Sequence, residues 1–179
     1  MTDTGFPEGE LGIIVIGSLL HRDELAYLFD GLPDRSARVR LDGYRRVFDA
    51  VADRRETVGD RCAVLNLHSA DAWCNGVLVT DLSPREFGIY ARRETTYRFE
   101  IVDSEAVTYY ENESVALPDE IIVASDAPSH ADVKPIPSYV KTCLSGARQW
   151  GETFYDEFLE TTAVASGESL RSYLDIDRK

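Results

Sequence analysis

An apolar run near the start of the chain, Gly12-Ile13-Ile14-Val15-Ile16, stops at Gly17-Ser18 and resumes as Leu19-Leu20 before a charged segment. An uninterrupted run of β-branched residues predicts a buried strand, and Gly17 permits a tight turn after it. The charged residues beyond Leu20 predict an amphipathic helix from about Asp23 to Gly31. A strand that turns sharply into a helix exposes several backbone N–H groups at one point, which suits an anion or a developing oxyanion.

The charge of the chain is strongly negative, with 32 acidic residues against 19 basic ones and a formal net charge of −13. Only Lys134, Lys141 and Lys179 are lysines. An acidic, lysine-poor surface is expected of a halophilic protein, because a salt-rich cytoplasm screens the repulsion between like charges. The chain has no basic stripe to neutralise phosphates, so nucleic acid is not an expected partner.

The length of 179 residues fits a single domain. We expect a flexible lead-in over residues 1–10, one domain over 11–174 and a tail over 175–179. No apolar stretch reaches the length that spans a bilayer, and the N-terminal segment lacks the basic start of a signal peptide, so no membrane partner is expected. The three cysteines cannot form a disulfide framework. We therefore expect a cytoplasmic protein.

Strand patterns occupy the middle of the chain. They predict one or two short strands within Arg38–Phe48, around Asp42-Gly43, and further strands over Cys62–Leu67, Asn75–Leu82, Thr96–Val102, Ala106–Tyr110 and Glu120–Ala124. In Thr96–Val102, the alternation predicts a buried face of Tyr97, Phe99 and Ile101. Charged residues predict a loop over Asp53–Asp60, and a second loop rich in Pro and Asp is expected over Asp126–Pro137.

Helical signals follow and separate these strands. Ser83-Pro84-Arg85-Glu86 has the residues of a capping box and predicts a helix that ends near Arg93. Apolar spacing predicts a helix from Tyr139 to Trp150 that Gly151 ends, a second around Phe154–Leu159, and a short one over Glu168–Leu174. Strands in the middle with helices at both ends predict an α+β fold.

Most catalytic and metal-binding patterns are missing from the sequence. His21, His68 and His130 are scattered, and no Gly-x-Ser-x-Gly elbow or dinucleotide-binding fingerprint is present. Cys62, His68 and Cys74 are an alternative set of metal ligands, but their spacing matches no Cys-x-x-Cys pattern. We expect no metal and no cofactor.

Glu94 is the strongest candidate for chemistry, because it stands at the expected junction of the capped helix with the strand that follows. Such a junction can direct a carboxylate inward. Tyr90, Tyr97 and Phe99 would then form apolar walls that raise its pKa, as a general acid/base requires. The alternative is an ordinary solvated surface glutamate.

Three blocks of the sequence resemble the γ-glutamylcyclotransferase family. The family begins with a strand that runs into Tyr-Gly-Ser-x-Leu, which corresponds here to Ile16-Gly17-Ser18-Leu19-Leu20. A strand pattern similar to Asn75–Val79 follows, and then a helix that ends in a Glu, similar to Arg93–Val102. The third block is a Pro-Ser-x-x-Tyr segment with its helix, matched by Pro137-Ser138-Tyr139 and the residues that follow. The blocks occur in the family's order and cover most of residues 13–160.

The resemblance implies a mixed β-barrel with flanking helices, within the α+β class, and a reaction that needs no cofactor. In that reaction the α-amine of a small γ-glutamyl compound attacks its own γ-carbonyl and releases 5-oxoproline. The resemblance assigns Glu94 as the general acid/base. It also assigns substrate binding to the turn and to the helix start, at Ile16, Gly17, Ser18, Leu19, Leu20 and Tyr139.

One position departs from the family pattern, since Ile16 stands where the family has tyrosine. The departure implies either an altered substrate preference or a loss of turnover. The alternative function is therefore a non-catalytic, ligand-binding or regulatory protein that keeps the barrel and the pocket. A structural or interaction protein is a third possibility, for which the acidic surface is the only indication.

Overall fold

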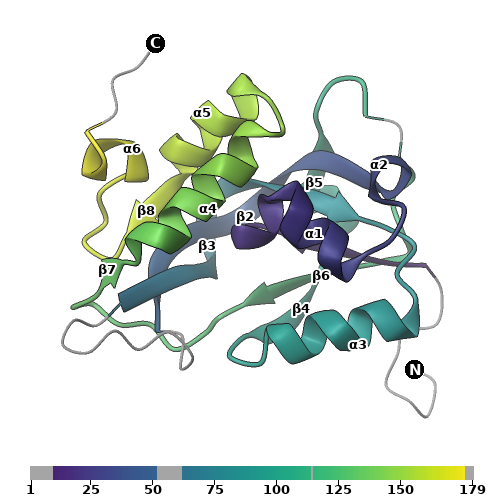
Figure 1. Cartoon of the computed structure of the whole chain (residues 1–179), viewed down its shortest axis with the longest axis horizontal. Coiled ribbons are helices and arrows are strands. Elements are labelled where there is room, and N and C mark those ends of the chain that lie inside the picture. The colour runs from purple at the N-terminus through teal and green to yellow at the C-terminus, as the bar shows by residue number, and fades with distance from the viewer. Residues whose placement is uncertain (1–9, 52–61, 114, 176–179) are drawn as a thin grey trace.

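The computed structural model describes residues 10–51, 62–113 and 115–175, and in them a mixed sheet curls into a half-barrel with helices packed around it (Figure 1). The strand order is β4-β6-β1-β3-β2-β5, with β7 paired to β3 and β8 to β2. The strands are β1 (Leu11–Val15), β2 (Ser36–Val51), β3 (Cys62–Val79), β4 (Arg98–Val102), β5 (Val107–Tyr109), β6 (Glu120–Ser125), β7 (Lys134–Pro135) and β8 (Thr162–Val164). The α+β fold with a barrel-like mixed sheet, expected from the sequence, is confirmed.

The α-helices pack on one face of the curled sheet, since their buried apolar residues all belong to one core cluster. Figure 1 shows α3 beside β4 and β6, while α4, α5 and α6 gather near β7 and β8. The α-helices are α1 (Arg22–Leu28), α2 (Leu32–Arg35), α3 (Pro84–Arg93), α4 (Pro137–Arg148), α5 (Glu152–Thr161) and α6 (Leu170–Tyr173), with 3₁₀ helices η1 (Ser18–Leu20) and η2 (Ser104–Ala106). Most of the expected lead-in and tail, and the Asp53–Asp60 loop, lie outside the described residues.

Strand β1 is buried on both faces, which explains its continuous apolar run. It lies between β3, to which it is antiparallel, and β6, to which it is parallel. Ile13 and Val15 belong to the core under the helices, whereas Ile14 belongs to a second apolar cluster on the opposite face of the sheet. The end of β1 is therefore held between two packed layers.

The expectations of one or two short strands around Asp42-Gly43, and of two separate strands over Cys62–Leu67 and Asn75–Leu82, were wrong. Strands β2 and β3 form one long antiparallel ribbon, and the register shifts only between Asp42 and Tyr44 and between Phe48 and Ala50. Gly43 has a φ of +82° and lies at the first shift, where Asp42 pairs with Trp73 and Tyr44 with Ser69, so the extra residues belong to β3 and the ribbon continues. The segment Ser69–Ala72 belongs to β3 and is largely exposed, which explains why it lacks the apolar residues of the rest of the strand.

The expectation of a buried face in the segment Thr96–Val102 was also wrong. The strand begins only at Arg98, and Ile101 is 65% exposed and Phe99 38% exposed. Because β4 is the end strand of the sheet, its outward side has little to pack against beyond α3. Phe99 contacts Phe87 and Tyr90 of that helix, and Val102 is the buried residue of the strand.

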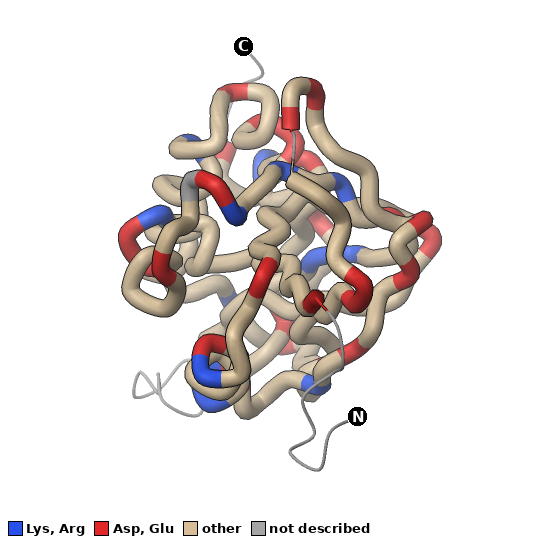
Figure 2. The backbone as a smooth tube through the Cα atoms, turned by 90° about the vertical axis from the view of Figure 1, so that its right-hand side faces the viewer, with Lys and Arg blue, Asp and Glu red and all other residues tan. Residues whose placement is uncertain are grey.

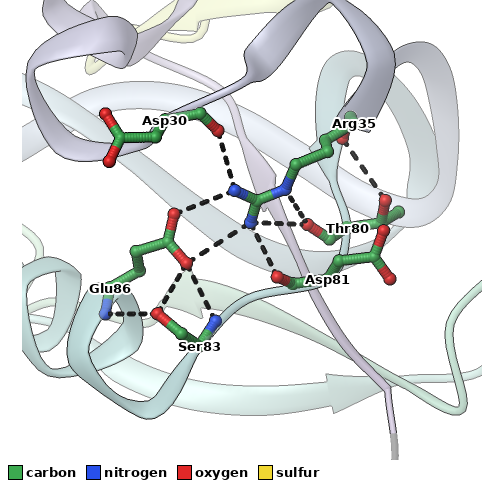
Figure 3. Close-up of polar contacts among 6 residues, drawn as sticks. All are labelled: Asp30, Arg35, Thr80, Asp81, Ser83 and Glu86. Atoms are coloured by element: carbon green, nitrogen blue, oxygen red, sulfur yellow. Dashed lines mark hydrogen bonds and ion pairs between the residues drawn. The ribbon is translucent and has the colours of Figure 1, made fainter.

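The half-buried side chain of Arg35 holds the beginning of α3 in place. The Arg35 guanidinium donates to the backbone oxygens of Asp30, Thr80 and Asp81 and forms an ion pair of 2.9 Å with Glu86 (Figure 3). Glu86 also completes the predicted capping box, since its carboxylate accepts from the Ser83 N–H and the Ser83 hydroxyl accepts from the Glu86 N–H. The helix that ends at Glu94 is thereby tied to α2 and β3.

Helix α4 packs against η1 with almost no space between the two backbones. A β-carbon at Gly146 would lie 2.4 Å from the His21 nitrogen, so only glycine permits this approach. One turn further along, the Trp150 indole N–H donates to the Leu20 carbonyl at 2.7 Å, which adds a hydrogen bond to the same contact. The turn after β1 is therefore braced by the helix that carries Tyr139.

Candidate active site

A small cavity lies at the end of β1, where the turn, α3 and α4 meet. Its volume is about 40 Å³, and its lining residues come from five separate segments: Ile14, Val15, Ile16, Gly17, Ser18, Leu19, Leu65, Tyr90, Glu94, Tyr97, Ala124 and Tyr139. That volume is close to the share of one or two water molecules. Only a small polar group of a ligand, such as a carbonyl or a carboxylate, would fit in the enclosed part.

Glu94 reaches the cavity from the C-terminal end of α3, as the sequence predicted. It is the C-cap residue, and its backbone N–H donates to the Tyr90 carbonyl at 3.1 Å. Its side chain is only 18% exposed. A mostly buried carboxylate next to a turn with backbone N–H groups is a suitable pair for moving a proton and holding a negative oxygen.

Arg93 connects Glu94 with the turn, a role that the sequence analysis did not predict. Its guanidinium lies 3.6 Å from the Glu94 carboxylate, donates to the Ser18 hydroxyl at 3.3 Å, and is 3.2 Å from Glu24. The sequence signal for Arg93 was its place in the last turn of α3, where basic residues interact favourably with the helix dipole. That signal does not predict the contacts with Ser18 and Glu24. Arg93 thus orients groups on two sides of the cavity entrance.

Tyr139 reaches the cavity from the first turn of α4. Its ring packs edge-on against Phe48, with centroids 6.1 Å apart, and the backbone N–H of Ser18 donates to its hydroxyl. Burial raises the pKa of Tyr139 well above its usual value, and the nearby carboxylate of Glu94 also raises it, whereas the Ser18 hydrogen bond acts in the opposite direction. The phenol is therefore protonated at neutral pH and able to donate a hydrogen bond.

Tyr90 and Tyr97 form the aromatic walls beside Glu94, as expected. Burial raises the pKa of Tyr90 well above its usual value, and the charge of Glu94 adds to this effect. The Tyr97 hydroxyl donates to the Leu65 carbonyl at 2.5 Å, which fixes the residue before β4 against β3. Phe99, the third expected wall, is not among the lining residues and packs against Phe87 and Tyr90 of α3 instead.

Five of the six expected substrate-binding residues line the cavity, namely Ile16, Gly17, Ser18, Leu19 and Tyr139. The sixth, Leu20, is fully buried in the core under α4 and is not among the described lining residues. Its carbonyl accepts from Trp150. The sequence placed Leu20 in the site because the family motif ends there, but the 3₁₀ turn rotates its side chain into the core.

The alternative metal ligands do not assemble into a site. Cys74 is fully buried, and His68 lies 2.9 Å from Asp49. Within the part of the chain that the structure describes, no three His, Cys, Asp or Glu side chains gather closely enough to hold a metal ion. Among the same residues, no helix is both long and apolar enough to cross a membrane.

Comparisons with known proteins give matches in structure alone. No protein-family model matches the sequence, and no curated protein matches it significantly. A solved structure described as a gamma-glutamyl cyclotransferase superposes with a TM-score of 0.61 at 13% identity, over 93% of this chain and 97% of that one. An uncharacterized protein from Homo sapiens gives 0.59 at 14%, over 84% and 87% of the two chains.

A third solved structure is a yeast γ-glutamyl cyclotransferase described as specific to glutathione, with a TM-score of 0.51 at 14% identity over 93% of this chain and 99% of that one. At these identities the similarity is one of fold. Because the superpositions cover nearly the whole length of both enzymes, the match includes the curled sheet and its helices together. The chain has the fold of the γ-glutamyl cyclotransferases.

Proposed function

We propose that this protein is a γ-glutamylcyclotransferase that releases 5-oxoproline from a small γ-glutamyl compound. The observation that carries the proposal is the cavity itself. Residues from the turn after β1, from the end of α3 and from the start of α4 meet there, although Gly17, Glu94 and Tyr139 are far apart in the sequence. The fold shared with γ-glutamyl cyclotransferases supports the same reading.

The reaction makes modest demands, because nucleophile and electrophile belong to one molecule. Glu94 takes a proton from the α-ammonium, and the amine attacks the γ-carbonyl carbon to close a five-membered ring. The bond between that carbon and the leaving nitrogen then breaks. Of the three ammonium protons, one stays on the ring amide and two pass to the leaving nitrogen, which departs as an ammonium. Proton transfer of this kind contributes roughly 10²–10⁴-fold.

The turn supplies the second requirement, a place for negative charge. The backbone N–H groups of Gly17 and Leu19 would hold the γ-carbonyl oxygen as it becomes an oxyanion, or the α-carboxylate of the substrate, whereas the Ser18 N–H already donates to Tyr139. The Tyr139 hydroxyl, which is protonated and lies against this turn, would contact the substrate beside these N–H groups. The small volume of the cavity suits such a carbonyl or carboxylate group.

A direct assay tests the proposal. Purified protein at high salt is incubated with γ-glutamyl amino acids, γ-glutamylamines and γ-glutamyl dipeptides including glutathione, and 5-oxoproline is measured. Release from at least one class is the expected result. If no compound yields 5-oxoproline above the uncatalysed rate, the protein is not a cyclotransferase of this kind.

One observation favours the second candidate, a ligand-binding protein without turnover. Ile16 lines the cavity at the position of the family's tyrosine, so a hydroxyl that the family pattern would place there is missing. Calorimetric titration with 5-oxoproline distinguishes the two functions. Saturable binding by a protein that releases no 5-oxoproline would support the second candidate.

A further inference from the structure

Arg46, in the second half of β2, is a fully buried arginine that lies outside the cavity. It has no exposed surface, and in the described part of the chain it forms no ion pair with a carboxylate. Burial lowers its pKa, although an arginine remains protonated in a folded protein. Burial of a charge without a carboxylate partner costs free energy, so hydrogen bonds to the guanidinium have to offset that cost.

The guanidinium reaches across the interior of the half-barrel to the point where β1 ends. It donates to the Ile16 carbonyl at 3.3 Å, to the Asn75 carbonyl at 2.6 Å and to the Asn75 side-chain oxygen at 2.9 Å. Asn75 is itself fixed, because its amide donates to the Phe154 carbonyl at 2.7 Å. Two of the partners are thus backbone carbonyls, that of Ile16 just after β1 and that of Asn75 in β3.

The remaining hydrogen bonds of Arg46 go to the C-terminal end of α5. Its partners there are the Thr162 hydroxyl at 2.8 Å, the Thr161 hydroxyl at 3.3 Å and the Phe158 carbonyl at 3.4 Å. The guanidinium also lies 4.0 Å from the centroid of the Phe158 ring. The end of a helix carries partial negative charge, and the ring face attracts a cation, so α5 offsets part of the charge.

The contact with Ile16 has a geometric consequence for the cavity. In a trans peptide the C=O and the following N–H point in opposite directions, and the described residues contain no cis peptide. Since the Ile16 carbonyl points to Arg46, the Gly17 N–H points away from Arg46. Gly17 lines the cavity and Arg46 does not. The peptide that carries this N–H is therefore bound by a side chain that is not among the lining residues of the cavity.

We propose that Arg46 is a positioning residue that fixes the Ile16–Gly17 peptide so that its N–H is held towards the cavity, an inference that rests on the proposed function for its effect on turnover. Arg46 hydrogen-bonds to three segments at once: the end of β1, strand β3 and the end of α5. A lysine keeps the charge but presents one compact ammonium, which cannot span these partners.

The test compares R46K with T162V. R46K removes the guanidinium that reaches Ile16, whereas T162V removes one partner on the α5 side and leaves the Ile16 contact in place. The ¹⁵N order parameter of the Gly17 amide should fall from the rigid range, about 0.85, in R46K and stay rigid in T162V. The kcat for 5-oxoproline release should fall about 10- to 100-fold in R46K, with KM changed less, because an oxyanion donor acts in the transition state.

The outcomes separate this inference from the proposed function. A rigid Gly17 amide in R46K, an unchanged kcat, or an equal loss in T162V at matched thermal stability overturns the positioning role. If the wild-type protein releases no 5-oxoproline, the proposed function fails and the order parameters alone decide whether Arg46 fixes the peptide. If R46K does not fold, N75A, which removes the side-chain acceptor beside Ile16, should give the same pattern to a smaller extent, and its absence counts against the inference.

Discussion

The hydroxyl oxygen of Tyr139 lies 2.7 Å from the position that a β-carbon would occupy at Gly17. Real β-carbons do not approach a heavy atom so closely, so the start of α4 can meet the turn after β1 only because residue 17 has no side chain. The two residues are 122 positions apart in the sequence. Their contact gives Gly17 a physical role at the cavity that the Gly-Ser motif alone does not specify.

The first prediction follows from this contact. Gly17→Ala should displace the Tyr139 hydroxyl, reduce thermal stability and weaken the binding of 5-oxoproline. In the double variant G17A/Y139F the clashing oxygen is gone, and the next ring atom is 3.8 Å away, an ordinary contact. The double variant should therefore melt at a higher temperature than G17A alone, which calorimetry measures.

Gly88 provides the matched control for this prediction. It lies in α3, and its nearest neighbour to an added β-carbon is Arg92 at 3.7 Å. Gly88→Ala should raise stability by roughly 0.5–1 kcal/mol, because alanine is the better helix residue. If G17A and G88A melt alike, the close approach of Tyr139 is not present in solution.

The second prediction concerns acid stability. Burial by itself would raise the pKa of the Glu86 carboxyl, but hydrogen bonds from Arg35 and Ser83 outweigh it and lower that pKa from 4.5 to about 2. Because the folded value lies below the unfolded one, this contribution is fully present above about pH 4.5 and is lost as the pH falls towards 2. Figure 3 shows the contacts that would be lost.

Glu86→Gln should therefore destabilise the protein at neutral pH and matter little at pH 2. Glutamine can keep the capping box but loses the ion pair with Arg35, which corresponds to roughly 1 kcal/mol, or about 2–4 °C in Tm for a chain of this size. Thermal melts of both proteins from pH 7 to pH 2 provide the measurement. A constant difference between them over that range would show that Glu86 titrates alike in the folded and unfolded states.

The third prediction concerns salt. With a net charge of −13, repulsion should destabilise the folded chain at low ionic strength. Figure 2 shows acidic residues distributed around much of the outline, with basic residues at fewer positions. The screening length is roughly 10 Å at 0.1 M salt and about 3 Å at 1 M, so Tm should rise with KCl. A Tm that stays flat or falls between these concentrations would contradict the halophilic interpretation.

Local signals in the sequence predicted the elements that hold the cavity. The capping box at Ser83 and Glu86 and the apolar spacing before Gly151 depend on residues a few positions apart, and α3 and α4 begin and end close to where these signals predict. The turn at Gly17 was likewise visible from its neighbours. Glu94 and Tyr139 therefore lie on the helices that the sequence predicts for them, and the cavity brings them together.

Features that depend on distant partners were not predictable in this way. Gly43 has the composition of a turn, but pairing of β2 with β3 on both sides keeps it within one ribbon. The exposure of Ile101 follows from the position of β4 at the end of the sheet, which no local pattern encodes. Arg46 has the sequence signature of a surface residue, and it is buried by β3 and by α5, both distant in the sequence.

The most direct test of the account is the rate of 5-oxoproline release by Glu94→Gln beside the wild-type protein. Glutamine keeps the shape of the side chain but cannot carry a proton, so the rate should fall by about two to four orders of magnitude while the fold is kept. Glu105→Gln, at an exposed position in η2, is the matched control and should leave the rate unchanged. Wild-type turnover by the Glu94→Gln variant would contradict the assignment of Glu94 as the general acid/base.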